Sequence, residues 1–265
     1  MGRIELTSAD DPRVAGFHDL PDAERLLRQG LFVAEGRRVV RRLLESDRLQ
    51  AQAVIVTPSA ADALEDLLAM RPALPAYVVP QAVMNEVAGF NIHRGCLALG
   101  VRPPPLPWRT LTADRRLLVA LERVGDADNV GSVFRNAAAF GVDGLLLGPG
   151  CADPLYRKAI RTSMGAALRL PFAAAEPWPA VLHECRAAGR AVVALTPTAD
   201  ADPIDAVVAA LTGRPLMLVL GHEGEGLGAD TLAAASHLAR IPIAPGVDSV
   251  NVAVAAAIAL YEVSR

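Results

Sequence analysis

Residues 215–226 read PLMLVLGHEGEG, an apolar run that ends in a glycine-rich turn. The run has the length of a strand buried on both faces, and a helical pattern follows it at 228–235. A strand, a glycine-rich turn and a helix in this order usually bind phosphate through backbone N–H groups. Here the turn carries Glu223 and Glu225, and anions repel a pyrophosphate. The turn therefore either binds nothing or binds a ligand that is not an anion.

The same alternation of strands and helices extends on both sides of this turn. The apolar strand candidates are Leu117–Leu121, Gly144–Leu147, Ala191–Leu195, Leu216–Leu220 and Leu238–Ile243. Helical patterns separate them, and a helix from Ser249 to Val263 closes the chain. This pattern predicts an α/β fold with a mostly parallel sheet and helices on both faces. Ligands bind at the carboxyl ends of such strands, so the turns after them are the places to look for chemistry.

The N-terminal part shows a smaller set of alternating elements. Helical spacing covers Glu35–Leu44 and Ala60–Met70, and short strands are expected at Ala53–Thr57, Tyr77–Val79 and Cys96–Val101. We expect these to form a second α/β unit with a mostly parallel sheet.

A proline-rich stretch, RPPPLPW at 102–108, separates the two parts. Consecutive prolines continue neither a helix nor a central strand, and they fit a stiff linker. We therefore predict an N-terminal domain at 1–101, a linker at 102–110 and a C-terminal domain at 111–265.

The composition describes a folded protein with little net charge. The chain has 265 residues, of which 52% are hydrophobic and 21% charged, and its formal net charge is −3. It can therefore build a core, and charge alone does not indicate a nucleic-acid ligand. No uninterrupted apolar stretch spans a membrane, the first residues lack a signal-peptide pattern, and the cysteines are far apart. We expect a cytoplasmic protein with reduced thiols and no metal site.

The placement of arginine is more informative than the total charge. One cluster lies at residues 25–48 and a second at residues 157–169. The clusters are either solvated helix faces or contacts for phosphates, and the sequence alone leaves both interpretations open.

Two further turns carry polar residues. In Asp126–Asn136, either Asp128 or Asn129 is expected to cap a helix that runs to Phe140, with Arg135 inside it. The other turn, Ile241–Asn251, leads into a helix that is apolar nearly all round. Such a helix is buried on more than one side, in the core or against a second subunit. Ser249 and Asn251 are expected at its buried start.

These turns contain three ordered motifs: NxGxxxR at 129–135, LxLGxExxG at 218–226, and IPIxPG followed by SxNVAVAAAIALYE at 241–262. Together they resemble the SpoU (TrmH) family of RNA ribose 2′-O-methyltransferases in the SPOUT superfamily, over roughly residues 115–264. The segment 157–165 is similar to a further family segment. Gln29–Gly36, with the Arg-rich helix after it, resembles the family's ribosomal-protein-like RNA-binding domain. Departures are few: DADN at 126–129 replaces the common DPGN, and His222 replaces a usual small residue.

The resemblance implies S-adenosylmethionine as the cofactor, which carries a positive sulfonium and no phosphate. Carboxylates in the turn are compatible with that cation. By position, the implied cofactor-binding residues are Leu195, Leu220, Gly221, Gly226, Ile241, Ile243 and Val250. The implied catalytic residues are Arg135, Asn129, Glu223, Ser249 and Asn251. The RNA-binding residues expected from the arginine clusters are Arg37, Arg38, Arg41, Arg157 and Arg161.

The family fold also implies a trefoil knot in the C-terminal part and a homodimer. The expected reaction is 2′-O-methylation of a ribose in RNA, with ribosomal RNA favoured over tRNA by the separate N-terminal domain. In this reaction we expect Arg135 to stabilise the developing oxyanion rather than to act as a base, because a guanidinium stays protonated.

Two other classes remain open at this stage. A non-catalytic RNA-binding protein would share the fold, and the α/β alternation also suits a dinucleotide-dependent oxidoreductase. The dinucleotide fingerprint is G-x-G-x-x-G, whereas this turn has G-x-x-G-x-G. In the turn, His222 is interpreted as a turn residue rather than as a base.

Overall fold

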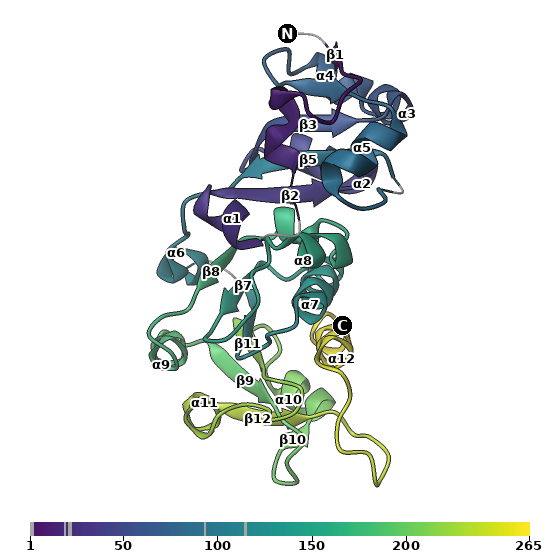
Figure 1. The fold of residues 1–265 in the computed structure, drawn as a ribbon. Helices are drawn as coiled ribbons and strands as arrows, with labels where there is room; N and C mark the ends of the chain where they lie inside the picture. The colour runs from purple at the N-terminus through teal and green to yellow at the C-terminus, as the bar shows by residue number, and fades with distance from the viewer. Residues whose placement is uncertain (1–2, 19, 21–22, 93, 114–115) are drawn as a thin grey trace. The chain divides into compact units, whose positions relative to one another are not determined.

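Alternating apolar segments of the chain form two sheets, each covered by helices on both faces (Figure 1). The computed structural model describes residues 3–18, 20, 23–92, 94–113 and 116–265. The chain divides into two compact units, one of residues 1–104 with 155–169 and one of residues 105–154 with 170–265.

The first unit contains a five-stranded sheet in the order β1-β4-β3-β5-β2. Its strands are β1 (Arg3–Glu5), β2 (Leu31–Glu35), β3 (Gln50–Val56), β4 (Ala76–Val78) and β5 (Cys96–Val101). Its helices are η1 (Pro12–Phe17), α1 (Ala23–Arg28), α2 (Arg37–Leu44), α3 (Pro58–Ala63), α4 (Glu65–Ala69), α5 (Gln81–Ala88), α8 (Arg157–Thr162) and η2 (Ala166–Leu168). The helix α8 packs against β2, so a segment distant in sequence belongs to this unit.

Three expectations for this unit were wrong. The sheet is mixed rather than mostly parallel, because β5 lies between β2 and β3 and runs antiparallel to both. The expected helix at Ala60–Met70 is two short helices, since Leu64 leaves the helical conformation at φ −117° and ψ 8°. The helix expected at Glu35–Leu44 starts at Arg37, because Glu35 is the last residue of the strand β2. The apolar run of β2 is short, and the helical pattern that follows it hid the strand.

The second unit contains a seven-stranded sheet in the order β10-β12-β9-β11-β6-β7-β8, and every pairing in it is parallel. Its strands are β6 (Leu117–Leu121), β7 (Gly144–Leu147), β8 (Phe172–Ala174), β9 (Ala191–Leu195), β10 (Asp202–Pro203), β11 (Leu216–Leu220) and β12 (His237–Arg240). Its helices are α6 (Trp108–Thr112), α7 (Ala127–Ala139), α9 (Ala180–Ala187), α10 (Ile204–Ala210), α11 (Ala229–Ala234) and α12 (Val252–Val263). The prediction of an α/β fold with a mostly parallel sheet is confirmed, and the knot stays a prediction.

The strands of the second unit are buried on both faces, which explains their uninterrupted apolar runs. Alternate residues such as Leu118, Val192 and Met217 share a core with residues of α6, α9 and α11. On the other face, α7 packs beside α12 and α12 beside α10 (Figure 1). This places α7 and α12, which carry several predicted site residues, next to each other.

Element ends in the second unit differ from the expected ones in four places. Asp126 caps α7 by accepting from the N–H of Asp128, so neither Asp128 nor Asn129 is the cap. The strand β12 ends at Arg240 rather than at Ile243. Pro242 has no N–H to donate to a neighbouring strand, so it cannot continue the pairing. The helix α12 starts at Val252, and Ser249 and Asn251 before it are exposed rather than buried. The helix α6 begins within the predicted linker.

The three cysteines are all free, and burial makes their thiols poor acids. Burial raises the pKa of Cys96 to about 12, and it also raises the pKa of Cys151 and of Cys185. A raised pKa lowers the fraction of reactive thiolate at pH 8. We expect a thiol reagent at pH 8 to modify only the half-buried Cys151, slowly, and to modify all three cysteines after unfolding. Loss of the slow native reaction in Cys151→Ser is the control, and rapid modification of all three in the native protein would contradict the assignment.

No helix in the described part of the chain is long and apolar enough to cross a membrane. Among those same residues, no cluster of His, Cys, Asp and Glu side chains is arranged to hold a metal ion.

Candidate active site

A pocket of about 380 Å³ lies where the strands β9 and β11 end, at the carboxyl edge of the seven-stranded sheet. The segment after β12 and the start of α12 complete it. All seven residues predicted to bind a cofactor line this pocket: Leu195, Leu220, Gly221, Gly226, Ile241, Ile243 and Val250. Two of the predicted catalytic residues, Glu223 and Ser249, also line it. The topology therefore brings three segments distant in sequence to one cavity.

The wall of the pocket is mostly apolar. Leu195, Ile241 and Val250 are half-buried, and Ile243 is 36% exposed, which is unusual for a large aliphatic side chain. Apolar side chains that remain accessible around a cavity are typical of a small-molecule site. The glycines of the turn add backbone groups with no side chain above them. The pocket thus suits a partly apolar ligand that approaches the main chain closely.

His222 holds the glycine-rich turn from within. Its Nδ1 accepts hydrogen bonds from the N–H of Gly224 at 3.0 Å and of Glu225 at 3.1 Å. Its carbonyl accepts from the N–H of Gly226 at 2.9 Å. The ring nitrogen therefore replaces the side-chain oxygen of an Asx-type turn. The interpretation of His222 as a turn residue is confirmed.

The two carboxylates of the turn both have partners within the protein. Glu223 Oε1 accepts from Asn251 Nδ2 at 2.5 Å. Glu225 Oε2 forms an ion pair with Arg123 Nη1 at 2.9 Å. The charge of Glu225 is therefore paired with a cation, and the carboxylate of Glu223 is hydrogen-bonded to a neutral amide. These contacts help the turn to tolerate two acidic residues.

Asn251 joins three elements of the site. Its Oδ1 accepts from the N–H of Ala253 at 2.9 Å and of Val254 at 3.3 Å, which caps α12. Its Nδ2 donates to Asn129 Oδ1 at 3.0 Å as well as to Glu223. Since Asp126 caps α7, the side chain of Asn129 is available for this contact. The amide of Asn251 thus connects α7, the glycine-rich turn and α12.

A second hydrogen bond holds the same two helices. Asn136 Nδ2 on α7 donates to the carbonyl of Ala253 on α12 at 2.8 Å. The rings of Phe140 and Tyr261 meet edge to face farther along, with centroids 6.3 Å apart. The start of α12 is therefore fixed relative to Asn129, which precedes Arg135 on α7.

Arg135 is exposed on α7, and its side chain makes no hydrogen bond or ion pair with any described residue. Ser249 is exposed at the mouth of the pocket. The structure therefore brings Asn129, Glu223 and Asn251 into one network and leaves Arg135 outside it. An arginine without a partner is free to contact a ligand that the protein alone does not supply.

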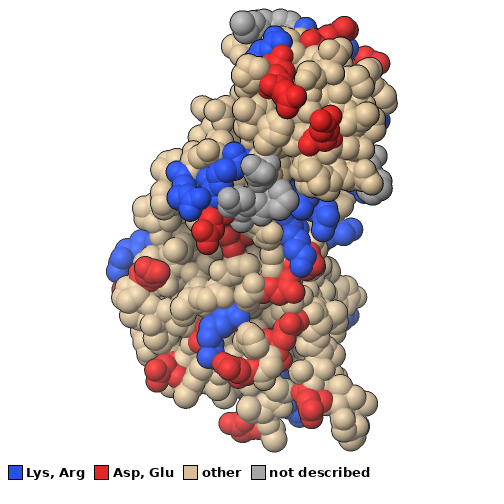
Figure 2. Space-filling model, in the orientation of Figure 1, with Lys and Arg blue, Asp and Glu red and all other residues tan. Residues whose placement is uncertain are grey.

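The five predicted RNA-binding arginines all lie in the first unit. They differ in whether the side chain forms an ion pair with an acidic residue. Arg41 forms a two-pronged ion pair with Asp66, at 2.7 and 2.9 Å, and Arg157 pairs with Glu35 at 2.7 Å. Arg37 donates to Ser59 at 2.8 Å, and Arg38 and Arg161 are exposed. On the face drawn in Figure 2, basic side chains are interspersed with acidic ones.

The two residues that follow β6 also contribute to the site, and they were not predicted from the sequence. Glu122 is 6% exposed, and its Oε2 accepts from the N–H of Gly228 at 3.3 Å. Arg123 contacts Glu225 and donates to the carbonyl of Gly226 at 3.4 Å. No motif marks this pair, because the contact depends on β6 being the neighbour of β11 in the sheet.

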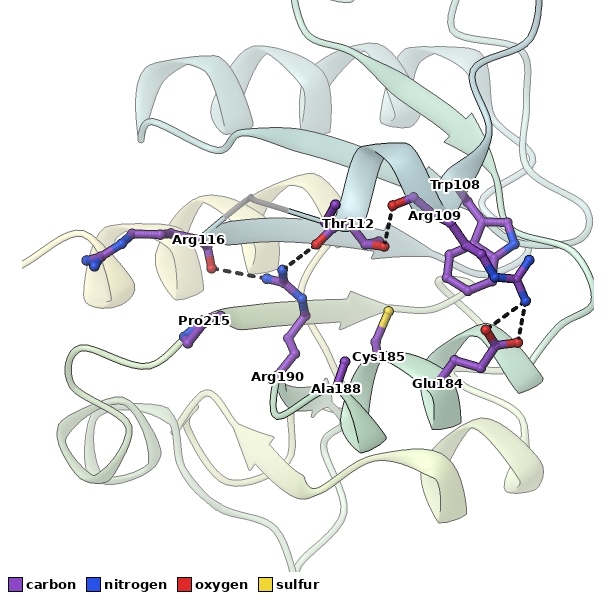
Figure 3. Close-up of a pocket in the computed structure, with 10 residues that line it drawn as sticks. Trp108, Arg109, Thr112, Arg116, Glu184, Cys185, Ala188, Arg190 and Pro215 are labelled. Carbon is purple, nitrogen blue, oxygen red and sulfur yellow. Dashed lines mark hydrogen bonds and ion pairs between the residues drawn. The ribbon is translucent and has the colours of Figure 1, made fainter.

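A second pocket, of about 450 Å³, is drawn in Figure 3 and lies at the opposite edge of the same sheet. The guanidinium groups of Arg190 and Arg109 in this pocket are engaged within the protein. Arg190 donates to the carbonyls of Thr112, Arg116 and Leu216 at 3.0 to 3.3 Å, and Arg109 pairs with Glu184 at 2.7 Å (Figure 3). Burial lowers the pKa of the Arg190 guanidinium. Through its bonds to Arg116 and Leu216, this group connects the starts of β6 and β11. We assign this pocket a role in stability.

The sequence and the fold of this chain are both similar to those of known RNA methyltransferases. The model of the SpoU rRNA Methylase family matches residues 116–261. A protein of Mycobacterium tuberculosis named as an uncharacterized tRNA/rRNA methyltransferase is 40% identical over 265 residues, which cover 98% of this chain and 91% of that protein. The solved structure of an AdoMet-bound rRNA methyltransferase from Sinorhizobium meliloti is 25% identical, with a TM-score of 0.84 over 98% of this chain and 97% of that one. A structure described as an RNA 2′-O ribose methyltransferase is 29% identical, with a TM-score of 0.75 over 98% of both chains.

Proposed function

Because the chain belongs to the SpoU rRNA methylase family, we propose that it transfers a methyl group from S-adenosylmethionine to a ribose 2′-hydroxyl of RNA. The observation that carries this proposal is the pocket at the carboxyl ends of β9 and β11, lined by all the predicted cofactor-binding residues. Ribosomal RNA is the proposed substrate class.

The residues present fit S-adenosylmethionine. The apolar wall, which includes Leu195 and Ile243, suits the adenine and the methylene groups of this molecule. The glycine-rich turn presents backbone groups, and its two carboxylates are compatible with a ligand that carries a positive sulfonium and no phosphate. A dinucleotide would place a pyrophosphate next to Glu223 and Glu225, which disfavours the oxidoreductase alternative.

Gly221→Ala tests the fit of the pocket. A Cβ at this position would lie 2.6 Å from the carbonyl of Gly226 and 2.7 Å from the N–H of Leu227, so the backbone of the turn has to move. We expect at least about tenfold weaker binding of S-adenosylmethionine, measured by calorimetry, because backbone shifts that relieve overpacking cost about 1–3 kcal/mol. Gly224→Ala is the matched control, since its Cβ meets only the ring of His222 at 3.5 Å. Equal affinities of the two variants would contradict this reading of the turn.

When bound, S-adenosylmethionine supplies an electrophilic methyl group on a positive sulfur. In the proposed reaction the ribose 2′-oxygen would take this methyl group while its hydroxyl proton passes to solvent, and S-adenosylhomocysteine would be left. We assign Arg135 to hold the phosphate of the target nucleotide and to stabilise the negative charge that develops on the oxygen. Asn129, Ser249 and Asn251 would orient the ribose, and Glu223 would hold Asn251 in place.

The first unit is proposed to bind RNA through phosphates contacted by Arg37, Arg38, Arg41, Arg157 and Arg161. For Arg41 and Arg157, such contacts require that the RNA share the guanidinium with its present acidic partner. The predicted division at residues 102–110, the knot, a homodimer and a cytoplasmic location are parts of the same proposal. Val254, Ile258 and Tyr261 on α12 are exposed, which supports a second subunit on that face.

Methyl transfer to different RNAs tests the substrate class. Wild-type protein is incubated with labelled S-adenosylmethionine and either unmodified ribosomal RNA or bulk tRNA. Label in ribosomal RNA alone is the expected result, and label in tRNA alone would favour the tRNA alternative. Cofactor binding without label in either RNA or in assembled ribosomal particles would favour a non-catalytic RNA-binding protein.

A further inference from the structure

We propose that Arg123 is a positioning residue that fixes the glycine-rich turn, 221–228, in the shape that binds the cofactor. The inference rests on the proposed function for the identity of the ligand, and on the contacts of the turn for everything else. It assigns a task to a residue outside every motif of the sequence.

The backbone of Arg123 adopts a conformation that few residues other than glycine adopt. Its φ is +56°, in the left-handed region, where an L side chain is strained. Its N–H donates to the carbonyl of Pro149 at 2.8 Å, which helps to hold this conformation. A glycine would occupy the position without strain. An arginine held here therefore indicates that its side chain has a use that offsets the strain.

The side chain reaches the middle of the glycine-rich turn. Nη1 lies 2.9 Å from Glu225 Oε2, and Nη2 donates to the carbonyl of Gly226 at 3.4 Å. Nε is buried and has no hydrogen-bond partner among the described residues, with Glu122 Oε1 at 3.7 Å. Both Glu225 and Gly226 line the pocket, whereas Arg123 does not. Arg123 therefore acts on the pocket through the turn.

The two residues after β6 fasten the turn at three points. The N–H of Glu122 donates to the carbonyl of Leu220 at 2.9 Å, where the turn begins. Arg123 holds its middle, and Glu122 Oε2 accepts from the N–H of Gly228 at 3.3 Å, where it ends. One backbone hydrogen bond thus holds the start of the turn, and the buried carboxylate of Glu122 holds its end. In the middle, the ring of His222 accepts hydrogen bonds from the N–H of Gly224 and Glu225. Arg123 adds the contacts that tie Glu225 and Gly226 to the end of β6.

This arrangement predicts how affinity depends on Arg123. When a ligand binds only one shape of a turn, the observed affinity falls in proportion to the fraction of molecules in that shape. Releasing Glu225 and the carbonyl of Gly226 lowers that fraction. It also leaves the carboxylate of Glu225 without its cation.

Arg123→Gly separates positioning from general stability. The variant removes the side chain and the strain together, so we expect a Tm equal to or above that of the wild type. We expect binding of S-adenosylhomocysteine, measured by calorimetry, to weaken about twofold to fivefold. Amide hydrogen exchange at residues 224–227 should become faster. A purely structural residue would change stability and affinity in the same direction.

Coupling to Glu225 is the second test. Glu225→Gln is expected to weaken binding to a similar extent, and the double variant Arg123→Gly/Glu225→Gln to bind no more weakly than either single variant. Arg123→Lys retains a charge but loses the fork, and partial recovery of affinity is expected. Arg214→Ala is the control for loss of a surface arginine, because Arg214 precedes β11 at the opposite edge of the sheet.

The outcomes distinguish this inference from the proposed function. If the wild type binds neither S-adenosylmethionine nor S-adenosylhomocysteine, the proposed cofactor is wrong. In that case, unchanged amide hydrogen exchange at residues 224–227 in Arg123→Gly would overturn the positioning role as well. If the wild type binds and Arg123→Gly binds equally well, only the positioning role is overturned. Additive losses in the double variant would also overturn it.

Discussion

Arg135→Ala is expected to reduce kcat for methyl transfer by about 10²–10³-fold, the range for removing one donor to a developing oxyanion. Arg135 is exposed on α7, and its side chain makes no hydrogen bond or ion pair within the described part of the chain. Removing it should therefore leave the fold and the cofactor pocket intact. Steady-state methyl transfer with saturating RNA and cofactor measures the change, and calorimetry should show unchanged binding of S-adenosylmethionine.

Arg135→Lys is the matched control for this variant. A lysine retains the positive charge but offers no planar fork for a phosphate, so we expect an activity between those of the wild type and Arg135→Ala. Wild-type kcat in Arg135→Ala would remove Arg135 from the catalytic machinery. A parallel loss of cofactor binding would show that its role is structural.

Asn251→Asp is expected to lower kcat/KM by about tenfold to 150-fold, since a hydrogen bond to a charged group contributes about 1.5–3 kcal/mol. The aspartate keeps the oxygen that accepts from Ala253 and Val254, so the cap of α12 remains. It loses the amide that donates to Asn129 and places a carboxylate against that of Glu223. Circular dichroism should show that the helix is retained while steady-state methyl transfer falls.

A compensating substitution isolates the repulsion. In Asn251→Asp/Glu223→Gln the amide and the carboxylate exchange places, so the contact between the two side chains is possible again. We expect the double variant to regain part of the lost kcat/KM. If the double variant is worse than Asn251→Asp alone, the contact between residues 223 and 251 does not carry the effect.

Periodicity located most of the second unit. Leu117–Leu121, Gly144–Leu147, Ala191–Leu195 and Leu216–Leu220 are strands with the expected bounds. These strands are buried on both faces, so their ends coincide with the ends of the apolar runs. The expected strand at Leu238–Ile243 was too long, because hydrophobicity continues past Arg240 into residues that face the pocket instead of a neighbouring strand.

The first unit was harder to predict because its strands are paired in both directions. The order β1-β4-β3-β5-β2 places β5 between two antiparallel neighbours, and alternation along the chain carries no information about that direction. The segment 155–169 lies in this unit although it interrupts the sequence of the other. Such placements depend on three-dimensional packing and leave no local periodic pattern.

The sequence motifs predicted the residues of the candidate site, and the structure shows the contacts among them. The ordered motifs identify Asn129, Glu223 and Asn251, but the hydrogen bonds that join these residues depend on α7 lying beside α12. Arg123 was missed because its partner Glu225 is distant in sequence and becomes its neighbour only when β6 pairs with β11. The resemblance accounts for the acidic residues of the turn by the charge of the implied cofactor, and the structure adds their partners within the protein.

The central claim is 2′-O-methylation of RNA by the site around Arg135 and the glycine-rich turn. The most direct measurement is incubation with labelled S-adenosylmethionine and unmodified ribosomal RNA or ribosomal particles, followed by complete digestion and separation of the nucleosides. We expect the wild type to place label in a 2′-O-methyl nucleoside and Arg135→Ala to place none there. Label on a base, or no label although the protein binds the cofactor, would contradict it.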